Sequence, residues 1–196
     1  MPGSPERLTR LLAQHFVAHQ EATTSALAAV AEEAVAAGLV LADALARGGK
    51  VLAFGNGGSA TQASHLAGEL IGRYGDNRRP YPAIALSSDP GSVTCIANDF
   101  GYDSLFARQV EALAQRGDVV IGLTTSGRSA NVLRGLAAAG KSGAVSIALT
   151  GAAGLVDATA DHVVAVPSTV TAHIQEIHLM LIHVWCAAVD DMLAES

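Results

Sequence analysis

The sequence predicts an α/β fold, a three-layer, doubly wound domain with about five parallel strands, preceded by N-terminal helices. Two observations lead to this prediction. Short, continuously apolar segments alternate with longer helical ones, which is typical of a parallel sheet covered on both faces. A long Ala-rich helical stretch precedes the first strand. The 196 residues are expected to form a single domain, 1–196, with 1–48 used for packing or oligomerisation and 49–196 as the α/β core.

Each element follows from a local pattern. The N-terminal helical segment is expected over 5–48, because Leu8, Leu12 and Phe16 recur at helical spacing and two glycines, Gly48 and Gly49, would end it. The expected strands are short and apolar, at 51–54, 83–86, 119–123, 145–149 and 163–166. The expected helices of the core lie at 60–74, 104–115, 130–141 and 172–193. The connections between parallel strands are expected to be right-handed.

Composition restricts the function. The net charge of −6 and the lack of a basic run argue against direct binding of nucleic acid, which needs clustered Lys and Arg. The apolar runs are short or interrupted, so we expect neither a membrane-spanning segment nor a signal peptide, and we expect a cytoplasmic protein. Cys95 and Cys186 both lie among apolar residues and are predicted to be buried, reduced thiols.

The loops that follow the strands are the expected ligand sites, since doubly wound sheets bind ligands beyond the carboxyl ends of their strands. The first expected strand runs into Gly55-Asn56-Gly57-Gly58-Ser59. Glycines allow the backbone to approach a ligand closely, and the amides at a helix start favour an anion. The segment matches neither of the common nucleotide-binding patterns. The alternative is an ordinary tight turn in which Ser59 caps the helix.

A second loop, after the third expected strand, is rich in hydroxyls. It contains Thr124, Thr125, Ser126 and Ser129, together with one glycine. Hydroxyls and helix N-terminal amides can hold a phosphate without a large positive charge. Capping by Ser126 or Ser129 is the alternative, but a cap needs a single hydroxyl, so the surplus favours phosphate binding.

Two helices carry candidate metal ligands. His65 and Glu69 are four residues apart and therefore share a helix face, where they could bind zinc or form an ordinary surface pair. The last helix carries Gln175 and His183 within an apolar pattern. These two lie about 12 Å apart along an ideal helix, so spacing alone does not suggest a shared ion. A lone histidine on an apolar face is more often a core residue.

Taken together, these residues closely resemble the SIS-domain proteins of the phosphoheptose isomerase type. The resemblance covers nearly the whole chain, and its motifs occur in the family's order. They are Gly55-Asn56-Gly57-Gly58-Ser59, His65 with Glu69, Ala97-Asn98-Asp99-Phe100-Gly101, Thr125-Ser126-Gly127 with Ser129, and Ile174-Gln175-Glu176-Ile177-His178 with His183.

The resemblance implies a flavodoxin-like SIS domain and a zinc-dependent isomerase of heptose biosynthesis. Such an enzyme converts sedoheptulose 7-phosphate to D-glycero-D-manno-heptose 7-phosphate through an enediol. It would be a homotetramer with active sites at subunit interfaces and one zinc per subunit. The implied zinc ligands are His65, Glu69, Gln175 and His183. The implied substrate contacts are Asn56, Gly57, Gly58, Ser59, Glu69, Asn98, Asp99, Thr124, Thr125, Ser126, Ser129 and Gln175.

The resemblance also implies that Glu69 and His183 are the acid and base of the reaction. Isomerisation needs a base, an acid and stabilisation of a developing oxyanion, and a metal can supply the last. Metal ligation weakens a carboxylate as a base, so the sequence leaves both roles open for Glu69. Ala172 stands where some relatives have Asp. Three alternatives stay open: a non-catalytic SIS protein that binds sugar phosphates, one that associates with the replication initiator, and an isomerase of a related ketose phosphate. Non-catalytic relatives tend to lose the glutamate and histidine that are present here.

Overall fold

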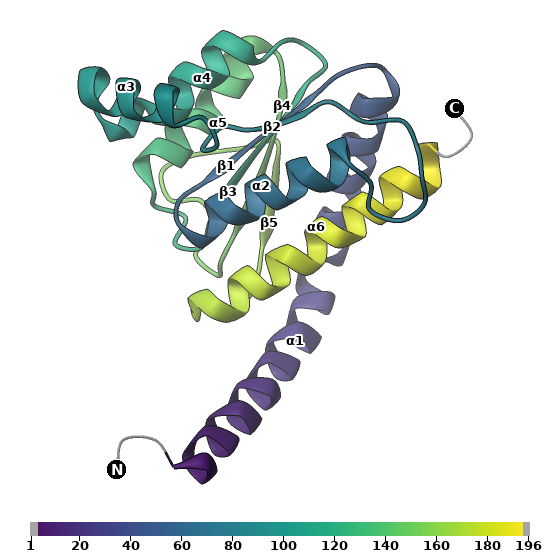
Figure 1. The fold of residues 1–196 in the computed structure, drawn as a ribbon, viewed down its shortest axis with the longest axis vertical. Coiled ribbons are helices and arrows are strands. Elements are labelled where there is room, and N and C mark those ends of the chain that lie inside the picture. Colours follow the sequence, from purple (N-terminus) through teal and green to yellow (C-terminus); the bar gives the residue numbers. More distant parts are fainter. Residues whose placement is uncertain (1–3, 194–196) are drawn as a thin grey trace.

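The structure, a computed structural model, describes residues 4–193. Within these residues five strands alternate with helices, as Figure 1 shows. The strands are β1 (Val51–Gly55), β2 (Ala83–Ala85), β3 (Val119–Thr124), β4 (Val145–Thr150) and β5 (His162–Ala165). The helices are α1 (Pro5–Ala46), α2 (Gly58–Ile71), α3 (Pro90–Phe100), the 3₁₀ turn η1 (Tyr102–Ser104), α4 (Leu105–Leu113), α5 (Ala130–Ser142) and α6 (Thr171–Leu193).

The strands form one parallel sheet in the order β2-β1-β3-β4-β5. The chain steps from β1 to β2 on one side and then crosses to β3 on the other side of β1. Strand order therefore reverses between β1 and β3, at the place where doubly wound sheets bind ligands. The prediction of about five parallel strands in a doubly wound sheet is confirmed.

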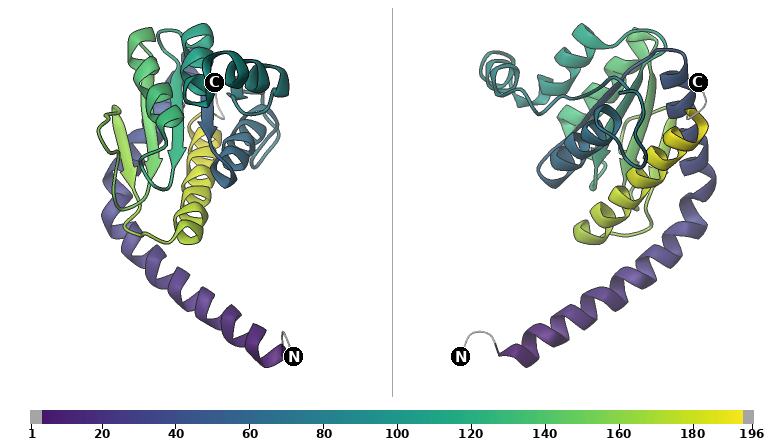
Figure 2. Two further views of the ribbon diagram at one scale, coloured as in Figure 1. Left: turned by 90° about the vertical axis from the view of Figure 1, so that its left-hand side faces the viewer. Right: turned by 45° about the vertical axis from the view of Figure 1, so that its right-hand side comes forward.

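Alternate residues of each strand face opposite helical layers. In β1, Val51 and Ala53 pack with α1, α2 and α6, whereas Leu52 and Phe54 pack with α4 and α5. All five β1 residues are buried, which explains the uninterrupted apolar run. The side view in Figure 2 shows the two helical layers on either side of the sheet.

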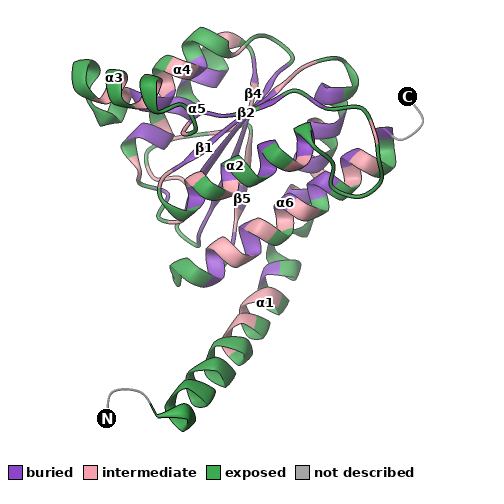
Figure 3. Ribbon diagram, in the orientation of Figure 1, coloured by how far each residue is buried: buried purple, intermediate pink, exposed green. Residues whose placement is uncertain are grey.

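Helix α1 is one continuous helix of 42 residues, about 63 Å long, rather than several helices. Ser4 caps its start by accepting a hydrogen bond from the Arg7 amide. Its second half is buried against the domain, while its first half projects from it with exposed apolar side chains (Figures 1 and 3). These side chains are Leu8, Leu11, Leu12, Phe16 and Val17.

Helix α6 packs along α1 through the only tryptophan in the chain. The Trp185 indole donates a hydrogen bond to the Ala34 carbonyl of α1 at 2.8 Å. A Cβ on Gly38 would lie 2.8 Å from the Trp185 ring, so this glycine makes room for it. Both α1 and α6 are long and apolar enough to span a membrane by composition alone. Their apolar windows are 39% and 44% buried inside the domain.

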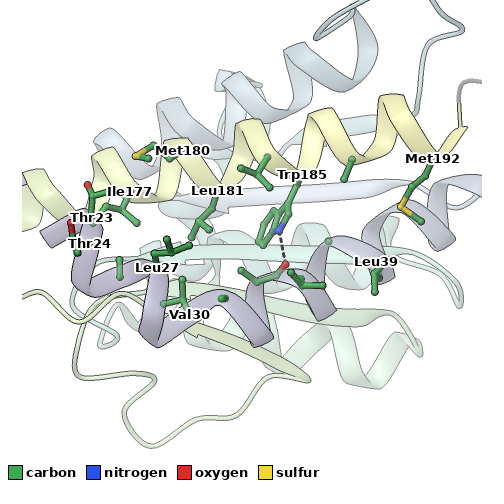
Figure 4. Close-up of a pocket in the computed structure, with 17 residues that line it drawn as sticks. Thr23, Thr24, Leu27, Val30, Leu39, Ile177, Met180, Leu181, Trp185 and Met192 are labelled. Atoms are coloured by element: carbon green, nitrogen blue, oxygen red, sulfur yellow. Dashed lines mark hydrogen bonds between the residues drawn. The ribbon is translucent and has the colours of Figure 1, made fainter. Parts of the chain in front are cut away.

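An apolar groove remains between α1 and α6 (Figure 4). It has a volume of about 530 Å³. Leu27 and Val30 line one wall, and Met180 and Leu181 line the other. Leu27 is 71% exposed, so the groove opens to the surface.

Helix α3 is absent from the sequence-based prediction. It begins with Asp89, whose carboxylate accepts hydrogen bonds from the Gly91 and Ser92 amides, followed by Pro90 at the first position. The Ser92 hydroxyl and these two amides lower the Asp89 pKa. No residue of α3 is fully buried, although Val93 and Ile96 recur at helical spacing and pack against the domain core.

The prediction that both cysteines are buried is wrong for Cys95. This residue lies on α3 and is exposed, because that helix rests on the domain by only part of one face. Cys186 on α6 is buried as predicted, and burial raises its pKa to about 12, so it stays a thiol.

The packing of α5 on the sheet gives a first testable prediction. A Cβ on Gly135 would lie 2.7 Å from the Phe54 ring, whereas a Cβ on Gly140 of the same helix would meet nothing within 4 Å. We expect Gly135→Ala to lower the free energy of unfolding by about 1–3 kcal/mol. Gly140→Ala is the matched control and should raise it by roughly 0.5–1 kcal/mol through helix propensity. Urea denaturation measures both, and effects of the same sign would contradict the packing.

Candidate functional site

The glycine-rich loop after β1 lies at the switch point of the sheet. Gly57 is the N-cap of α2 and has a φ of 55°, a left-handed conformation that favours glycine. Helix α2 begins at Gly58, two residues before the predicted start, so Ser59 lies inside the first turn and is buried. The alternative in which Ser59 caps the helix is therefore not what the structure shows. Amides at a helix N-terminus favour an anion, so the expectation that this loop binds one stays a prediction.

Asn56 is fixed by two residues that sequence reasoning missed. Its side-chain amide donates to Asn131 Oδ1 at 2.9 Å, and Asn131 donates back to Asn56 Oδ1 at the same distance. The Tyr102 hydroxyl also donates to Asn56 Oδ1 at 2.9 Å. These bonds join the β1 loop to the starts of α5 and η1. The only sequence signal was a polar Asn131 two residues after Ser129, at a position that the structure buries.

The hydroxyl loop after β3 divides into buried and open parts. Thr124 is buried, and its hydroxyl donates to the Ser129 hydroxyl at 3.2 Å. Ser129 occupies the N-cap position of α5 but makes no side-chain capping bond. The exposed Ser126 hydroxyl accepts only a local bond, from the Arg128 amide at 3.3 Å. The loop therefore exposes hydroxyls and the amides at the start of α5 to solvent. Thr124 is buried beneath the loop and orients Ser129 through its hydrogen bond.

Gly127 holds this loop against the chain that follows β4. It has a φ of 65°, and a Cβ there would lie 1.8 Å from the Gly154 carbonyl oxygen. The Val156 amide donates to the Gly127 carbonyl at 3.0 Å. Because no side chain fits here, the course of the loop depends on glycine.

Asn98 and Asp99 lie near the end of α3, and both are exposed. The Asn98 amide donates to Asp99 Oδ1 at 2.7 Å. Among the described residues, no hydrogen bond connects this pair to either ligand loop. Their assignment as substrate contacts stays a prediction.

Three of the four predicted zinc ligands come together between α2 and α6. His65 Nε2 lies 3.5 Å from Glu69 Oε1 and 2.9 Å from His183 Nε2. His183 is half-buried and points at α2, so it is not an enclosed core residue. A tetrahedral zinc would separate two histidine nitrogens by about 3.3 Å, a shift of a few tenths of an ångström. His65 is the shared neighbour of Glu69 and His183, but among the described residues this trio is not a group whose ligand atoms all lie within 4.8 Å of one another, so its assignment as a zinc site stays a prediction.

Gln175 stands apart from this trio. A Cβ on Gly58 would lie 2.6 Å from Gln175 Nε2, which places the amide over the start of α2. Its backbone carbonyl accepts a hydrogen bond from Gln62 Nε2. Gly58 and His65 are about 10 Å apart along an ideal helix, so Gln175 is nearer the glycine loop than the histidines.

A second His/Glu group lies between α1 and the start of α6. The ligand atoms of His15, His173 and Glu176 are all within 4.8 Å of one another. No local sequence pattern indicates this group, because His15 lies 161 residues before Glu176 in the chain, while only His173 and Glu176 are close neighbours on α6.

His178 is the enclosed core histidine of α6. It is fully buried, and its Nε2 bonds to the Thr150 carbonyl at the end of β4 at 3.1 Å. Burial lowers its pKa to about 4, although the carbonyl opposes this shift. The ring is therefore neutral at pH 7 and donates to Thr150.

The sequence and fold of this chain are similar to those of known proteins. Residues 15–151 match the SIS domain family. The chain is 45% identical to the phosphoheptose isomerase of Solidesulfovibrio magneticus, over 97% of this chain and 94% of that protein. It is 52% identical to the phosphoheptose isomerase of Aquifex aeolicus, over 80% of this chain and 82% of the other. The phosphoheptose isomerase structure from Neisseria gonorrhoeae superposes with a TM-score of 0.85 at 40% identity, covering 94% of this chain and 99% of that one.

The buried His178 predicts a pH dependence of stability. Its folded pKa of about 4 lies below the unfolded value of 6.5, so between these values the unfolded chain binds a proton that the folded chain does not. The free energy of unfolding should therefore fall as the pH drops from about 6.5 to about 4, by on the order of 3 kcal/mol from this residue. Urea denaturation across this range should give a shallower pH slope for His178→Asn. An equal slope in both proteins would contradict the assignment.

Proposed function

Because this chain belongs to the SIS domain family, and within it to the phosphoheptose isomerases, we propose that it converts sedoheptulose 7-phosphate to D-glycero-D-manno-heptose 7-phosphate. The observation that carries the proposal is the meeting of His65, Glu69 and His183 on α2 and α6. Helix α2 begins at the glycine loop, so the same element joins an anion site to a group of proton-transfer residues.

The phosphate is anchored by the two loops at the switch point. Hydroxyls of Thr125, Ser126 and Ser129, with the amides at the start of α5, provide donors for its oxygens. Anchoring holds the reacting carbons in place and lowers the entropic part of the barrier. Asn56 retains one free N–H for a sugar hydroxyl, because Asn131 occupies only the other.

Glu69 and His183 carry the proton transfers. A base removes a proton from C1 of the ketose, the C1–C2 double bond of the enediol forms, and the C2 oxygen takes up a proton. Reprotonation at C2 and loss of the C1 hydroxyl proton then leave the aldehyde. Glu69 has two carboxylate oxygens, so one can hold a metal while the other handles a proton.

A zinc ion belongs to this proposal. His65, Glu69 and His183 would hold it, and Gln175 of α6, whose amide lies over the start of α2 in this structure, is the fourth ligand that the family resemblance implies. When bound, zinc polarises the substrate carbonyl as a Lewis acid. The remaining chemistry comes from the residues of the chain. A cytoplasmic location is also proposed, since doubly charged sugar phosphates do not cross membranes unaided.

We further propose a homotetramer with active sites at subunit interfaces. The exposed apolar side chains on the first half of α1 and the open groove between α1 and α6 support it. Monomeric proteins rarely expose contiguous apolar surface of this kind. A second copy is the occupant that would cover both, because α1 projects far enough from its own domain to reach a neighbour.

If the groove between α1 and α6 is a subunit interface, a charged residue placed in it should lower the oligomeric state. Light scattering after gel filtration should give four copies for the wild type and fewer for Leu27→Glu, because a carboxylate cannot be buried there unpaired. Leu113→Glu is the control, an exposed leucine on α4 on the opposite side of the sheet, and should stay tetrameric. A monomeric wild type would reject the proposed assembly.

The isomerase predicts that two conservative substitutions abolish turnover. An NMR assay with sedoheptulose 7-phosphate and zinc should show conversion by the wild type. Glu69→Gln and His183→Gln should each lower kcat by about 10²-fold or more, the usual contribution of a proton-transfer group. His162→Asn, far along the chain on β5, should keep wild-type activity.

Wild-type protein that binds the sugar phosphate without converting it would contradict the isomerase and favour a non-catalytic sugar-phosphate binder. Turnover that survives in Glu69→Gln and His183→Gln would instead reject the roles assigned to these residues.

A further inference from the structure

Four side chains converge where the projecting half of α1 passes the start of α6. His15 and His19, four residues apart, stack their rings with centroids 6.4 Å apart. The ring of His173 lies 5.3 Å from that of His15 and 6.1 Å from that of His19. Three imidazoles therefore surround one carboxylate, that of Glu176.

Glu176 contacts two of these rings at once. Its Oε1 lies 2.8 Å from His15 Nε2, and its Oε2 lies 2.8 Å from His19 Nδ1. The second contact lacks hydrogen-bond geometry. Both of its atoms, His19 Nδ1 and Glu176 Oε2, are buried and have no hydrogen-bond partner among the described residues. Buried polar atoms of this kind call for an explanation, and an ion is one.

We propose that this cluster binds a divalent transition-metal cation of the zinc type, separate from the ion between His65 and His183. The ligands are His15 Nε2, a ring nitrogen of His173 and a Glu176 oxygen, with water in the fourth position. With metal bound, His19, whose Nδ1 lies 2.8 Å from the second carboxylate oxygen, would donate to that oxygen and orient the carboxylate, as outer residues do in metal sites. The Thr23 hydroxyl lies 3.3 Å from His19 Nε2 and fixes that ring in turn.

The geometry is close to what a tetrahedral ion requires. The three ligand atoms lie within 4.8 Å of one another, and tetrahedral coordination by nitrogen and oxygen places ligand atoms about 3.3 Å apart. Rotation of exposed side chains covers the difference, since the His15 and Glu176 side chains are 45% and 40% exposed. A histidine and a glutamate three apart on one helix, completed from a neighbouring helix, also form metal sites in helical bundles.

This site is distinct from the one assigned to catalysis. Glu176 and His183 are seven residues apart, about 10 Å along α6. His15 and His19 belong to α1, which contributes nothing to the trio of His65, Glu69 and His183.

Bound metal would clamp the projecting half of α1 to the first turn of α6. Because the site exists only in the folded chain, a cation would stabilise the protein by mass action. The clamp also holds the turn that carries Gln175, the residue over the glycine loop. Metal at this site therefore steadies α6 at the end nearest the substrate loops.

Metal counting on the full-length protein tests the site. Protein stripped with a chelator is dialysed against micromolar Zn²⁺, and elemental analysis counts the metal per chain. The wild type should hold two ions, and His15→Ala and His65→Ala should hold one each. The double variant should hold none. His162→Asn is the matched control, because His162 pairs with Glu33 of α1 at 2.8 Å without a third ligand, and it should hold two.

Measurements on the His65→Ala variant test the second site alone, because this variant lacks the proposed catalytic zinc site. In that variant Zn²⁺ should raise the melting temperature, and the rise should disappear when His15 is also replaced. Circular dichroism confirms that each variant is folded, and His19→Ala gives a second, partly exposed position at which weaker binding is expected. A His65→Ala protein without metal, or a His15→Ala protein with two ions, would overturn the proposal. Loss of turnover in the wild type would leave these counts unchanged.

Discussion

The contact of Trp185 with the backbone of α1 sets the position of α6, and most of the candidate chemistry depends on that position. The indole bonds to the Ala34 carbonyl, and Gly38 leaves the space that the ring fills. This contact restrains α6 against sliding along α1 and against rotating about its own axis. The side chains that α6 presents to its neighbours are then fixed by helical geometry alone.

Polar side chains of α6 consequently contact three different parts of the protein. Toward the sheet, the neutral His178 bonds to the end of β4. Toward α2, His183 meets His65 and Glu69. Toward the first half of α1, His173 and Glu176 meet His15 and His19. The same residue type is thus a structural donor at His178 and a metal-ligand candidate at His183 and His173, and the neighbouring groups decide which.

The ligand loops obey a different constraint, the close approach of backbones at the switch point. Gly127 admits no side chain beside Gly154, and the reciprocal amides of Asn56 and Asn131 join the loop of β1 to the start of α5. These contacts preorganise the two loops before any ligand arrives. An acidic chain can thereby bind an anion through oriented amides and hydroxyls rather than through clustered positive charge.

Local patterns in the sequence were sufficient for much of this protein. Short apolar runs predicted the five strands and their parallel arrangement, because strands buried on both faces are apolar throughout. The glycines that follow these runs predicted the two loops. The spacing of His65 and Glu69 likewise placed them on one face. Helix α3 was missed although Val93, Ile96 and Phe100 follow helical spacing, and because none of its residues is fully buried, Cys95 on it is exposed.

Only the tertiary structure decided which distant faces meet. Asn131 and Tyr102 became partners of Asn56, and His15 came to lie against Glu176, through the packing of separate elements. Helical periodicity predicts which residues share a face of one helix. It does not predict which face of another helix packs against them. That choice depends on how side chains such as Trp185 interlock, which is a property of the packed core and not of any local segment.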